Sequence, residues 1–351
     1  MAAHRPLRVV LADDSSFMRA LVGRALADAG FDVVGRARDG HEALALCREL
    51  RPDVLTLDLA MPGLGGLDVL RRIAGGDGGG TPVVVVSAFS PADGARAVDA
   101  LTGGAFDLVP KPEAGGLAAF ARELAATVRA AAAGDDRPGP AALPVTVPAV
   151  RRSLPTTAGD RDPVLVVACS TGGPRALATL VPALPPRVGG GALVVQHMPA
   201  GFTRSLAERL DRGARVRVRE AADGDRLDPA TVLVAPGGRH LRLDGDALRL
   251  DDEPPVGGLR PRADLTIADV ARRHGERVLL VVLTGMGRDG SDGARAVRRH
   301  GGRVLVEAAA TCTVHGMPRA VAEAGLADAE LPIDELAATV ATALRTPAVA
   351  R

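Results

Sequence analysis

Val54-Leu55-Thr56-Leu57-Asp58 is the stretch that decides the fold of the first part of the chain. The residues before the aspartate have the nearly continuous apolar character of a short strand buried on both faces of a parallel sheet. Asp13 and Asp14 directly follow a similar apolar run near the N-terminus, and Lys111 follows a third. Because functional side chains of an open α/β sheet gather outside the carboxyl ends of its strands, the sequence predicts three carboxylates and one ammonium group close together.

This group of side chains suits a phosphoryl switch. Mg²⁺ prefers oxygen ligands, which Asp13 or Asp14 would supply together with Asp58. A carboxylate can also attack phosphorus, and Asp58 is the central candidate for that role. Lys111 offers a positive charge and Ser87 a hydroxyl donor for the bound phosphoryl group. Each residue alone would be read as a helix cap, a loop residue or a solvated charge, so the prediction depends on the joint pattern.

The composition excludes several classes of protein. With 351 residues, the chain is long enough for two domains. A net charge of +1 gives no basic footprint for DNA, and an aromatic content of 2% argues against a stacking surface for single-stranded nucleic acid. Three widely spaced cysteines suggest a reducing, cytoplasmic compartment. The sequence lacks an 18-residue apolar run, so we expect no membrane insertion.

Two series of alternating strand and helix signals indicate two α/β domains. We expect a first domain at 1–130, a proline-rich linker at 131–162, a second domain at 163–345 and a tail at 346–351. The expected strands of the first domain are Leu7–Leu11, Asp32–Arg36, Val54–Leu57, Val83–Val86 and Asp107–Val109. With amphipathic segments between them, they predict a doubly wound parallel sheet.

The second domain is predicted to be a doubly wound, mostly parallel α/β sheet with a hairpin. Its expected strands are Val164–Ala168, Ala192–Gln196, Val216–Arg219, Val232–Ala235, Val278–Leu283 and Arg303–Val306. The stretch His240–Leu250 alternates around Asp-Gly-Asp and predicts the hairpin. Helices are expected to start after Pro174, Ala200, Pro261, Asp289 and Pro318, with a last one at Ile333–Leu344.

A serine follows the first strand of the second domain. Residues 164–174 read VLVVACSTGGP, so Ser170 precedes two glycines and a proline in a tight turn from strand to helix. Backbone N–H groups at the start of that helix would stabilise negative charge there. The turn suits a nucleophile with an oxyanion hole, and it suits a phosphate-binding loop equally well.

Two further side chains are expected near Ser170. His197 follows another predicted strand immediately, and Asp289 lies in a glycine-rich loop after a third. Asp289 has the ordinary alternative of capping the helix that follows it, and His315 is the second candidate for a functional imidazole. Because the three strands would end at one edge of the sheet, Ser170, His197 and Asp289 fit a nucleophile, a base and an orienting carboxylate.

The first domain resembles the receiver domain of two-component response regulators. The matching stretches are LADDSSFMR, LTLDLAMPGLGGLDVL, VVVVSAFS and AFDLVPKP. The resemblance implies a flavodoxin-like, five-stranded parallel sheet that binds Mg²⁺ and accepts a phosphoryl group on Asp58 from a histidine kinase. Two positions depart from the usual pattern: Leu108 replaces an aromatic residue, and Gly65-Gly66 replaces Asp-Gly.

The second domain is similar to the catalytic domain of the chemotaxis protein-glutamate methylesterases of the CheB type. The matching stretches are CSTGGP, VVQHMPAGFT, LVAPGGRHL, VVLTGMGRDGSDGA and VHGMPRAV. The resemblance implies that Ser170 is the nucleophile, His197 the general base and Asp289 its partner. It implies that the loop at Met286 gives a backbone donor to the oxyanion hole, and that Thr171 orders the surroundings of the nucleophile.

The same resemblance implies hydrolysis of γ-glutamyl methyl esters on chemoreceptors, with deamidation of glutamines as a second activity, in sensory adaptation. The expected partners are methyl-accepting chemoreceptors and a chemotaxis histidine kinase, and we expect a monomer that binds no nucleic acid. We expect no cofactor for the ester hydrolysis. We also hypothesise that the unphosphorylated receiver covers the Ser170 crevice and that phosphorylation uncovers it.

Two other functions remain open at the level of sequence. The glycine-rich loops CSTGGP and TGMGRDG would suit a regulatory module that binds phosphate or a nucleotide, although neither of the common nucleotide-binding glycine motifs is present. A receiver-driven transcription factor would need a basic recognition helix, which the second domain lacks.

Overall fold

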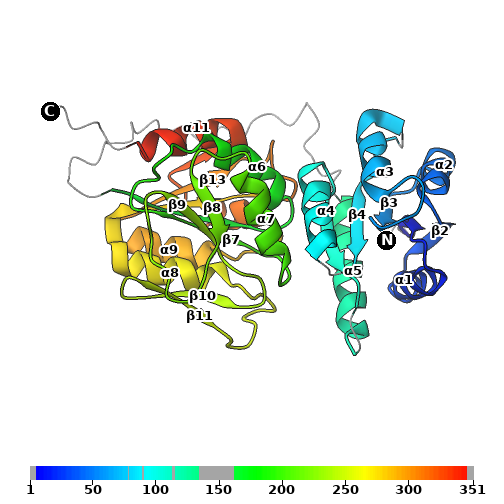
Figure 1. Ribbon diagram of the computed structural model, residues 1–351, viewed down its shortest axis with the longest axis horizontal. Coiled ribbons are helices and arrows are strands. Elements are labelled where there is room, and N and C mark those ends of the chain that lie inside the picture. Colours follow the sequence, from blue (N-terminus) through cyan, green and yellow to red (C-terminus); the bar gives the residue numbers. More distant parts are fainter. Residues whose placement is uncertain (1–4, 78, 89–90, 113–114, 134–161, 346–351) are drawn as a thin grey trace. The chain divides into compact units, whose positions relative to one another are not determined.

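The computed structural model describes residues 5–77, 79–88, 91–112, 115–133 and 162–345, with the side chains of 91–93 left out. The predicted tail and almost all of the predicted linker lie outside the described residues. The chain divides into two compact units near residue 136 (Figure 1), and each is described by itself. No helix in the described part of the chain is long and apolar enough to cross a membrane.

The first unit is a five-stranded sheet in the order β2-β1-β3-β4-β5, with every neighbouring pair parallel. The predicted doubly wound receiver fold is thereby confirmed. Its strands are β1 (Arg8–Ala12), β2 (Asp32–Ala37), β3 (Val54–Leu57), β4 (Val83–Ser87) and β5 (Asp107–Pro110). Its helices are α1 (Ser16–Asp28), α2 (Gly40–Leu50), α3 (Gly66–Arg72), a π-helical turn η1 (Ile73–Asp77), α4 (Pro91–Thr102) and α5 (Leu117–Ala132).

Two residues near strand ends determine where helices α1 and α3 begin. The Ser15 hydroxyl accepts a hydrogen bond from the backbone N–H of Met18 and caps α1. At the start of α3, a Cβ atom on Gly66 would lie 2.3 Å from the carbonyl oxygen of Asp58. Only glycine lets α3 begin this close to the strand end that carries Asp58.

The second unit contains a seven-stranded sheet in the order β14-β13-β12-β6-β7-β9-β8, and all its pairs are parallel. The strands are β6 (Val164–Cys169), β7 (Ala192–Gln196), β8 (Arg217–Glu220), β9 (Thr231–Val234), β12 (Val278–Val282), β13 (Arg303–Glu307) and β14 (Ala329–Leu331). The predicted hairpin forms a separate antiparallel pair, β10 (His240–Asp244) with β11 (Ala247–Asp251).

Helices cover both faces of this sheet (Figure 1). They are α6 (Gly173–Ala183), α7 (Phe202–Asp211), α8 (Ala263–His274), a 3₁₀ turn η3 (Gly275–Arg277), α9 (Ser291–Arg299), α10 (Gly316–Glu323) and α11 (Ile333–Ala343). Helix α6 contacts α7 and α11, whereas α8 contacts α9 and the hairpin strand β10. Alternate residues of the central strands, such as Val166 and Leu280, pack with α8, α9, α10 and the hairpin in one buried cluster.

The predictions for the second unit missed one strand and placed the starts of two helices too late. Strand β14 was not expected, because Ala329–Leu331 is a short edge strand without an apolar run. Helix α10 starts at Gly316, before Pro318 rather than after it, and α6 starts before Pro174. Proline fits the first turn of a helix, where a backbone N–H would have no intrahelical acceptor, so it marks a start only to within a turn.

Candidate active site and phosphoryl-acceptor site

The central strand β6 lies between β7 and β12, which come from different parts of the sequence. This is the topological switch point of the sheet, where α/β proteins bind ligands beyond the carboxyl ends of the strands. Cys169 of β6 pairs with Gln196 of β7, so the next residues, Ser170 and His197, leave the sheet side by side. The structure thus brings together two residues that are far apart in the sequence.

The backbone of Ser170 is held from both sides. Its N–H donates to the carbonyl oxygen of Thr284 at 3.0 Å, just beyond the end of β12. Its own carbonyl oxygen accepts from the N–H of Gly173 at 2.7 Å, which closes the turn into α6. Gly172 caps that helix with a φ of +80°, a conformation that favours glycine. The turn predicted from the glycines and Pro174 therefore presents Ser170 at the start of a helix.

His197 is paired with Asp289. The Nε2 atom of the imidazole lies 2.8 Å from Oδ2 of Asp289, and both side chains are largely buried. Since an ionised carboxylate only accepts hydrogen bonds, Nε2 carries the proton in the neutral ring. That tautomer leaves Nδ1 with the lone pair that can accept a proton from a hydroxyl group.

Asp289 is 2% exposed and is surrounded by donors. Its Oδ2 accepts from Ala263 N at 2.7 Å, and its Oδ1 accepts from Asp264 N at 2.9 Å and contacts Arg262 Nε at 2.8 Å. Burial alone would raise the pKa of this carboxyl, but the hydrogen bond and charge of His197, followed by the bonds to Asp264, hold the pKa well below its usual range. Asp289 is therefore the ionised partner that the His197 tautomer requires.

The ordinary alternative for Asp289, a cap on the helix that follows it, accounts for only one of its bonds, in which its Oδ1 accepts from the N–H of Gly290, the residue before α9, at 3.0 Å. Asp289 also caps α8, because two further N–H groups from which it accepts hydrogen bonds belong to the first two residues of that helix. Helix α9 is capped by Asp264, whose Oδ1 accepts from Gly290 N at 2.9 Å and Gly293 N at 2.8 Å. The two helices thus exchange caps: Asp289, which lies just before α9, caps α8, and Asp264, which lies in the first turn of α8, caps α9.

Arg262 and Asp264 are parts of the site that were missed in the sequence. Arg262 bridges Asp289 and Asp264, with its Nη2 atom 2.7 Å from Oδ2 of Asp264. Burial, and then the nearby Asp289 carboxylate, raise the pKa of Asp264. The only local signal was an arginine and an aspartate around the start of a predicted helix after Pro261, a pattern that predicts ordinary capping.

The loop after β12 packs tightly against Ser170. A Cβ atom on Gly285 would lie 2.8 Å from Cβ of Ser170, so only glycine allows this approach. Thr171 is buried, and its carbonyl oxygen accepts from the Thr284 hydroxyl at 2.9 Å. Met286 follows Gly285 and is 45% exposed. The two residues expected to support an oxyanion hole therefore lie in the segments that follow two neighbouring strands, Thr171 after β6 and Met286 after β12.

His315, the second candidate imidazole, and Cys169 lie outside the pair formed by His197 and Asp289. His315 precedes α10, and its Nε2 lies 3.3 Å from a carboxylate oxygen of Glu330 on the edge strand β14. The Cys169 side chain is buried next to the serine, and burial, followed by the charge of Glu307, raises the pKa of its thiol. A thiol in that environment stays protonated and unreactive.

In the first unit, the predicted acidic residues come together. One carboxylate oxygen from each of Asp13, Asp14 and Asp58 lies within 4.8 Å of the others. Nζ of Lys111 lies 2.7 Å from Oδ2 of Asp58 and 2.8 Å from Oδ2 of Asp13. Ser87 is buried at the end of β4, where its carbonyl oxygen accepts from Lys111 N at 2.8 Å.

This cluster combines three carboxyl groups with one cation, Lys111. Burial raises the pKa of Asp13, and the hydrogen bond from Lys111 offsets part of that rise. Burial would lower the pKa of Lys111, but hydrogen bonds to Asp13 and Asp58 outweigh it and raise the pKa. The lysine therefore remains a cation beside the carboxylates, as a site for a phosphoryl group requires. Three carboxylates with oxygen ligands this close fit the ligand preference of Mg²⁺.

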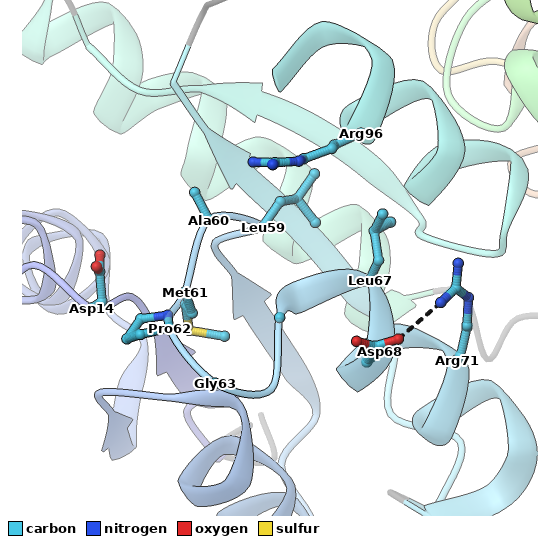
Figure 2. A pocket seen from close by; sticks show the side chains of 11 residues that line it. Asp14, Leu59, Ala60, Met61, Pro62, Gly63, Leu67, Asp68, Arg71 and Arg96 are labelled. Carbon is cyan, nitrogen blue, oxygen red and sulfur yellow. Dashed lines mark hydrogen bonds and ion pairs between the residues drawn. The ribbon is translucent and has the colours of Figure 1, made fainter. Parts of the chain in front are cut away.

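A pocket of about 600 Å³ lies beside this cluster (Figure 2). It is bounded by Asp14, by the loop from Leu59 to Gly65 and by Arg96 of α4. Asp68 and Arg71 form an ion pair of 2.8 Å on one wall. Asp14 is exposed, unlike Asp13 and Asp58, so the pocket offers access to the acidic cluster from its exposed member.

Comparison with known proteins identifies both units. Residues 165–340 match the model of the CheB methylesterase family, and residues 9–119 match the response regulator receiver domain. A protein-glutamate methylesterase/protein-glutamine glutaminase of Symbiobacterium thermophilum is 42% identical, over 97% of this chain and 98% of its own length. The corresponding protein of Thermotoga maritima is 39% identical, over 93% of this chain and 96% of its own.

A solved structure supports the second unit. The crystal structure of the Thermotoga maritima CheB methylesterase catalytic domain is 39% identical and has a TM-score of 0.50, with 52% of this chain and 99% of that chain covered. The matches cover both the receiver and the catalytic unit, in the order in which the two occur along this chain. The chain therefore belongs to the CheB methylesterase family, with a response regulator receiver domain at its N-terminal end.

Proposed function

We propose that this protein is a phosphorylation-regulated serine hydrolase that removes methyl groups from γ-glutamyl methyl esters of chemoreceptors. The activity is that of the protein-glutamate methylesterases/protein-glutamine glutaminases to which the chain is related over nearly its whole length. The observation that carries the assignment of residues is the 2.8 Å bond between His197 and Asp289, beside the strand end that bears Ser170.

In the proposed mechanism, Ser170 is the nucleophile. Nδ1 of His197 takes the proton of the Ser170 hydroxyl as its oxygen attacks the ester carbonyl. The imidazolium that forms is stabilised by Asp289 and then gives its proton to the leaving methanol. Water, deprotonated by His197, cleaves the acyl-enzyme and releases the glutamate side chain. With a glutamine side chain, the same steps release ammonia.

An oxyanion hole would stabilise the negative charge on the carbonyl oxygen in both steps. We propose that it uses backbone N–H groups of the turn after Ser170 and of the loop at Met286. The support is the close packing of Gly285 against Ser170 and the start of α6 next to the serine. Thr171 would hold this turn through its bond with Thr284.

In the receiver, we propose that Asp58 accepts a phosphoryl group from the histidine of a chemotaxis kinase. Asp13, Asp14 and Asp58 would hold Mg²⁺, which would neutralise charge on the phosphoryl oxygens. Lys111 would pair with the phosphoryl group after it leaves the kinase, and Ser87 would donate a hydrogen bond to it. The three cysteines are all free thiols, which agrees with a reaction in the cytoplasm.

The proposed activity is tested with receptor fragments that carry radiolabelled methyl esters or glutamines at their modification sites. The protein, supplied with a small phosphodonor and Mg²⁺, is expected to release methanol from the first fragment and ammonia from the second. A receptor fragment with glutamates at these positions is the control and should release neither. If the methylated fragment keeps its label with the phosphorylated protein, the assignment of substrate is wrong.

Regulation gives a separate prediction. We expect Asp58→Asn to abolish stable phosphorylation and the stimulation of methanol release by the phosphodonor, because an amide cannot form the acyl phosphate. Basal methanol release should remain. The measurements are ³²P incorporation and turnover with and without phosphodonor. Asp68→Asn, a change at an exposed carboxylate of the same unit, is the control and should respond normally.

A further inference from the structure

Gln196 connects the backbones of the two residues that react. It is the last residue of β7 and is 2% exposed. Its Nε2 atom donates one hydrogen bond to the carbonyl oxygen of Ser170 at 3.0 Å and another to that of His197 at 2.9 Å. A single buried amide group thus holds the nucleophile and the base through their main chains.

The orientation of this amide is determined by its surroundings. If it were rotated by half a turn, Oε1 would face two carbonyl oxygens and both hydrogen bonds would be lost. In the observed orientation Oε1 is buried and finds no hydrogen-bond donor among the described residues. A buried polar atom without a partner destabilises a fold, and an apolar side chain of the same size would avoid that cost.

The close contact with α6 keeps the amide in place. A Cβ atom on Gly173, the first residue of α6, would lie 2.0 Å from Oε1 of Gln196. Gly173 is also the residue whose N–H bonds to the Ser170 carbonyl. The carboxamide therefore fills the corner between the end of β7 and the turn that carries the nucleophile.

We propose that Gln196 is a positioning residue for the ester hydrolysis, and that it sets the distance and direction between the Ser170 hydroxyl and the His197 imidazole. The inference rests on the proposed roles of those two residues. Without the two N–H groups, the carbonyl oxygen of Ser170 would keep only its bond from the N–H of Gly173, and no donor would link it to the nearby carbonyl oxygen of His197. Their repulsion would turn the ends of β6 and β7 away from each other.

The test uses the full-length protein activated by a phosphodonor and a receptor fragment with labelled methyl esters. Gln196→Met keeps the length of the side chain and removes both donors. We expect kcat to fall about 10- to 100-fold, because a small misplacement of reacting groups has effects of that size. KM for the receptor fragment should stay within about two-fold, since the buried side chain presents almost no surface to a substrate.

A second variant gives a readout that a structural role would not change. In Gln196→Glu, burial raises the pKa of the introduced carboxyl. When ionised, it repels both carbonyl oxygens, and when protonated it donates to one of them. Its kcat relative to the unchanged protein should therefore rise as the pH falls from about 8 to about 6. The ratio for Gln196→Met should stay constant over that range.

Thr266→Val is the matched control. The Thr266 hydroxyl is buried and donates to the carbonyl oxygen of Leu241 at 2.6 Å, so this change also removes a buried hydrogen bond to the main chain. It should lower the melting temperature and leave kcat unchanged. If both Gln196 variants keep kcat within two-fold of the unchanged protein while Ser170→Ala abolishes turnover, the positioning role is wrong and the proposed function stands. If Ser170→Ala itself retains turnover, the proposed function fails first.

Discussion

Ser170→Ala is expected to reduce methanol release from methylated receptor by about 10⁴-fold or more. The hydroxyl oxygen is the atom that forms the acyl-enzyme, and no other group in the proposed mechanism can replace it. Any residual rate would come from binding and the oxyanion hole. The measurement is the initial rate of methanol release with the phosphorylated protein and saturating receptor fragment.

Cys169→Ala is the control for this prediction. Cys169 precedes the serine and is another potential nucleophile by residue type, but its thiol is buried and its pKa is raised. We expect the variant to retain activity within a few-fold, at a temperature where it remains folded. Loss of turnover in Cys169→Ala together with its retention in Ser170→Ala would move the nucleophile to the neighbouring position.

Asp289→Asn is expected to lower kcat by about 10⁴-fold, the size of the effect when the carboxylate of a Ser-His-Asp triad becomes an amide. The amide nitrogen would donate to Nε2 of His197 and leave the ring proton on Nδ1, which then cannot accept a proton from Ser170. The measurement is kcat for methanol release. Asp292→Asn is the control, since that carboxylate lies in the same region but is 72% exposed.

The same substitution tests the second role of Asp289. Removal of a charge that is buried among Arg262, His197 and helix N–H groups should reduce the free energy of unfolding by about 3 kcal/mol or more at neutral pH. Because the folded pKa lies below the unfolded value of 3.8, this stabilisation is full above that value and decreases as the pH falls toward the folded pKa.

Urea unfolding of both proteins at about pH 7 and about pH 3 measures this dependence. The difference between the unchanged protein and Asp289→Asn should be smaller in acid. For Asp292→Asn, the difference should be below about 0.5 kcal/mol at both values. A difference for Asp289→Asn that grows as the pH falls would contradict a lowered pKa for this carboxyl.

The positions of the main candidate residues could be predicted from the sequence, because each residue directly follows the carboxyl end of a strand. Ser170, His197 and the acidic cluster of the receiver each come directly after an apolar run, and the order of strands does not alter the edge at which parallel strands end. The receiver fold and the parallel sheet of the second unit were predictable for the same reason. These features need only local patterns and one general rule of α/β topology.

Other features depend on contacts that no local pattern encodes. Arg262 and Asp264 reach the site because α8 and α9 exchange caps. Asp289 taken alone predicted a bond at the start of α9, but not its bonds to α8. The sequence predicts Gln196 only as the last residue of a buried strand. Its hydrogen bond to the carbonyl oxygen of Ser170 depends on the turn after the neighbouring strand β6, which no local pattern around Gln196 indicates. The edge strand β14 forms through pairing with β13 rather than through any strand propensity of its own.

The exchange of caps between α8 and α9 has an evolutionary consequence. Asp289 accepts hydrogen bonds at the starts of two helices besides its bond to His197, whereas the role that we propose for the Ser170 side chain is in the chemistry alone. A descendant of this chain that had stopped hydrolysing esters could lose its serine at little cost to folding, but not its aspartate. Pseudoenzymes that arise from such a lineage should therefore retain the acidic residue after the nucleophile has disappeared.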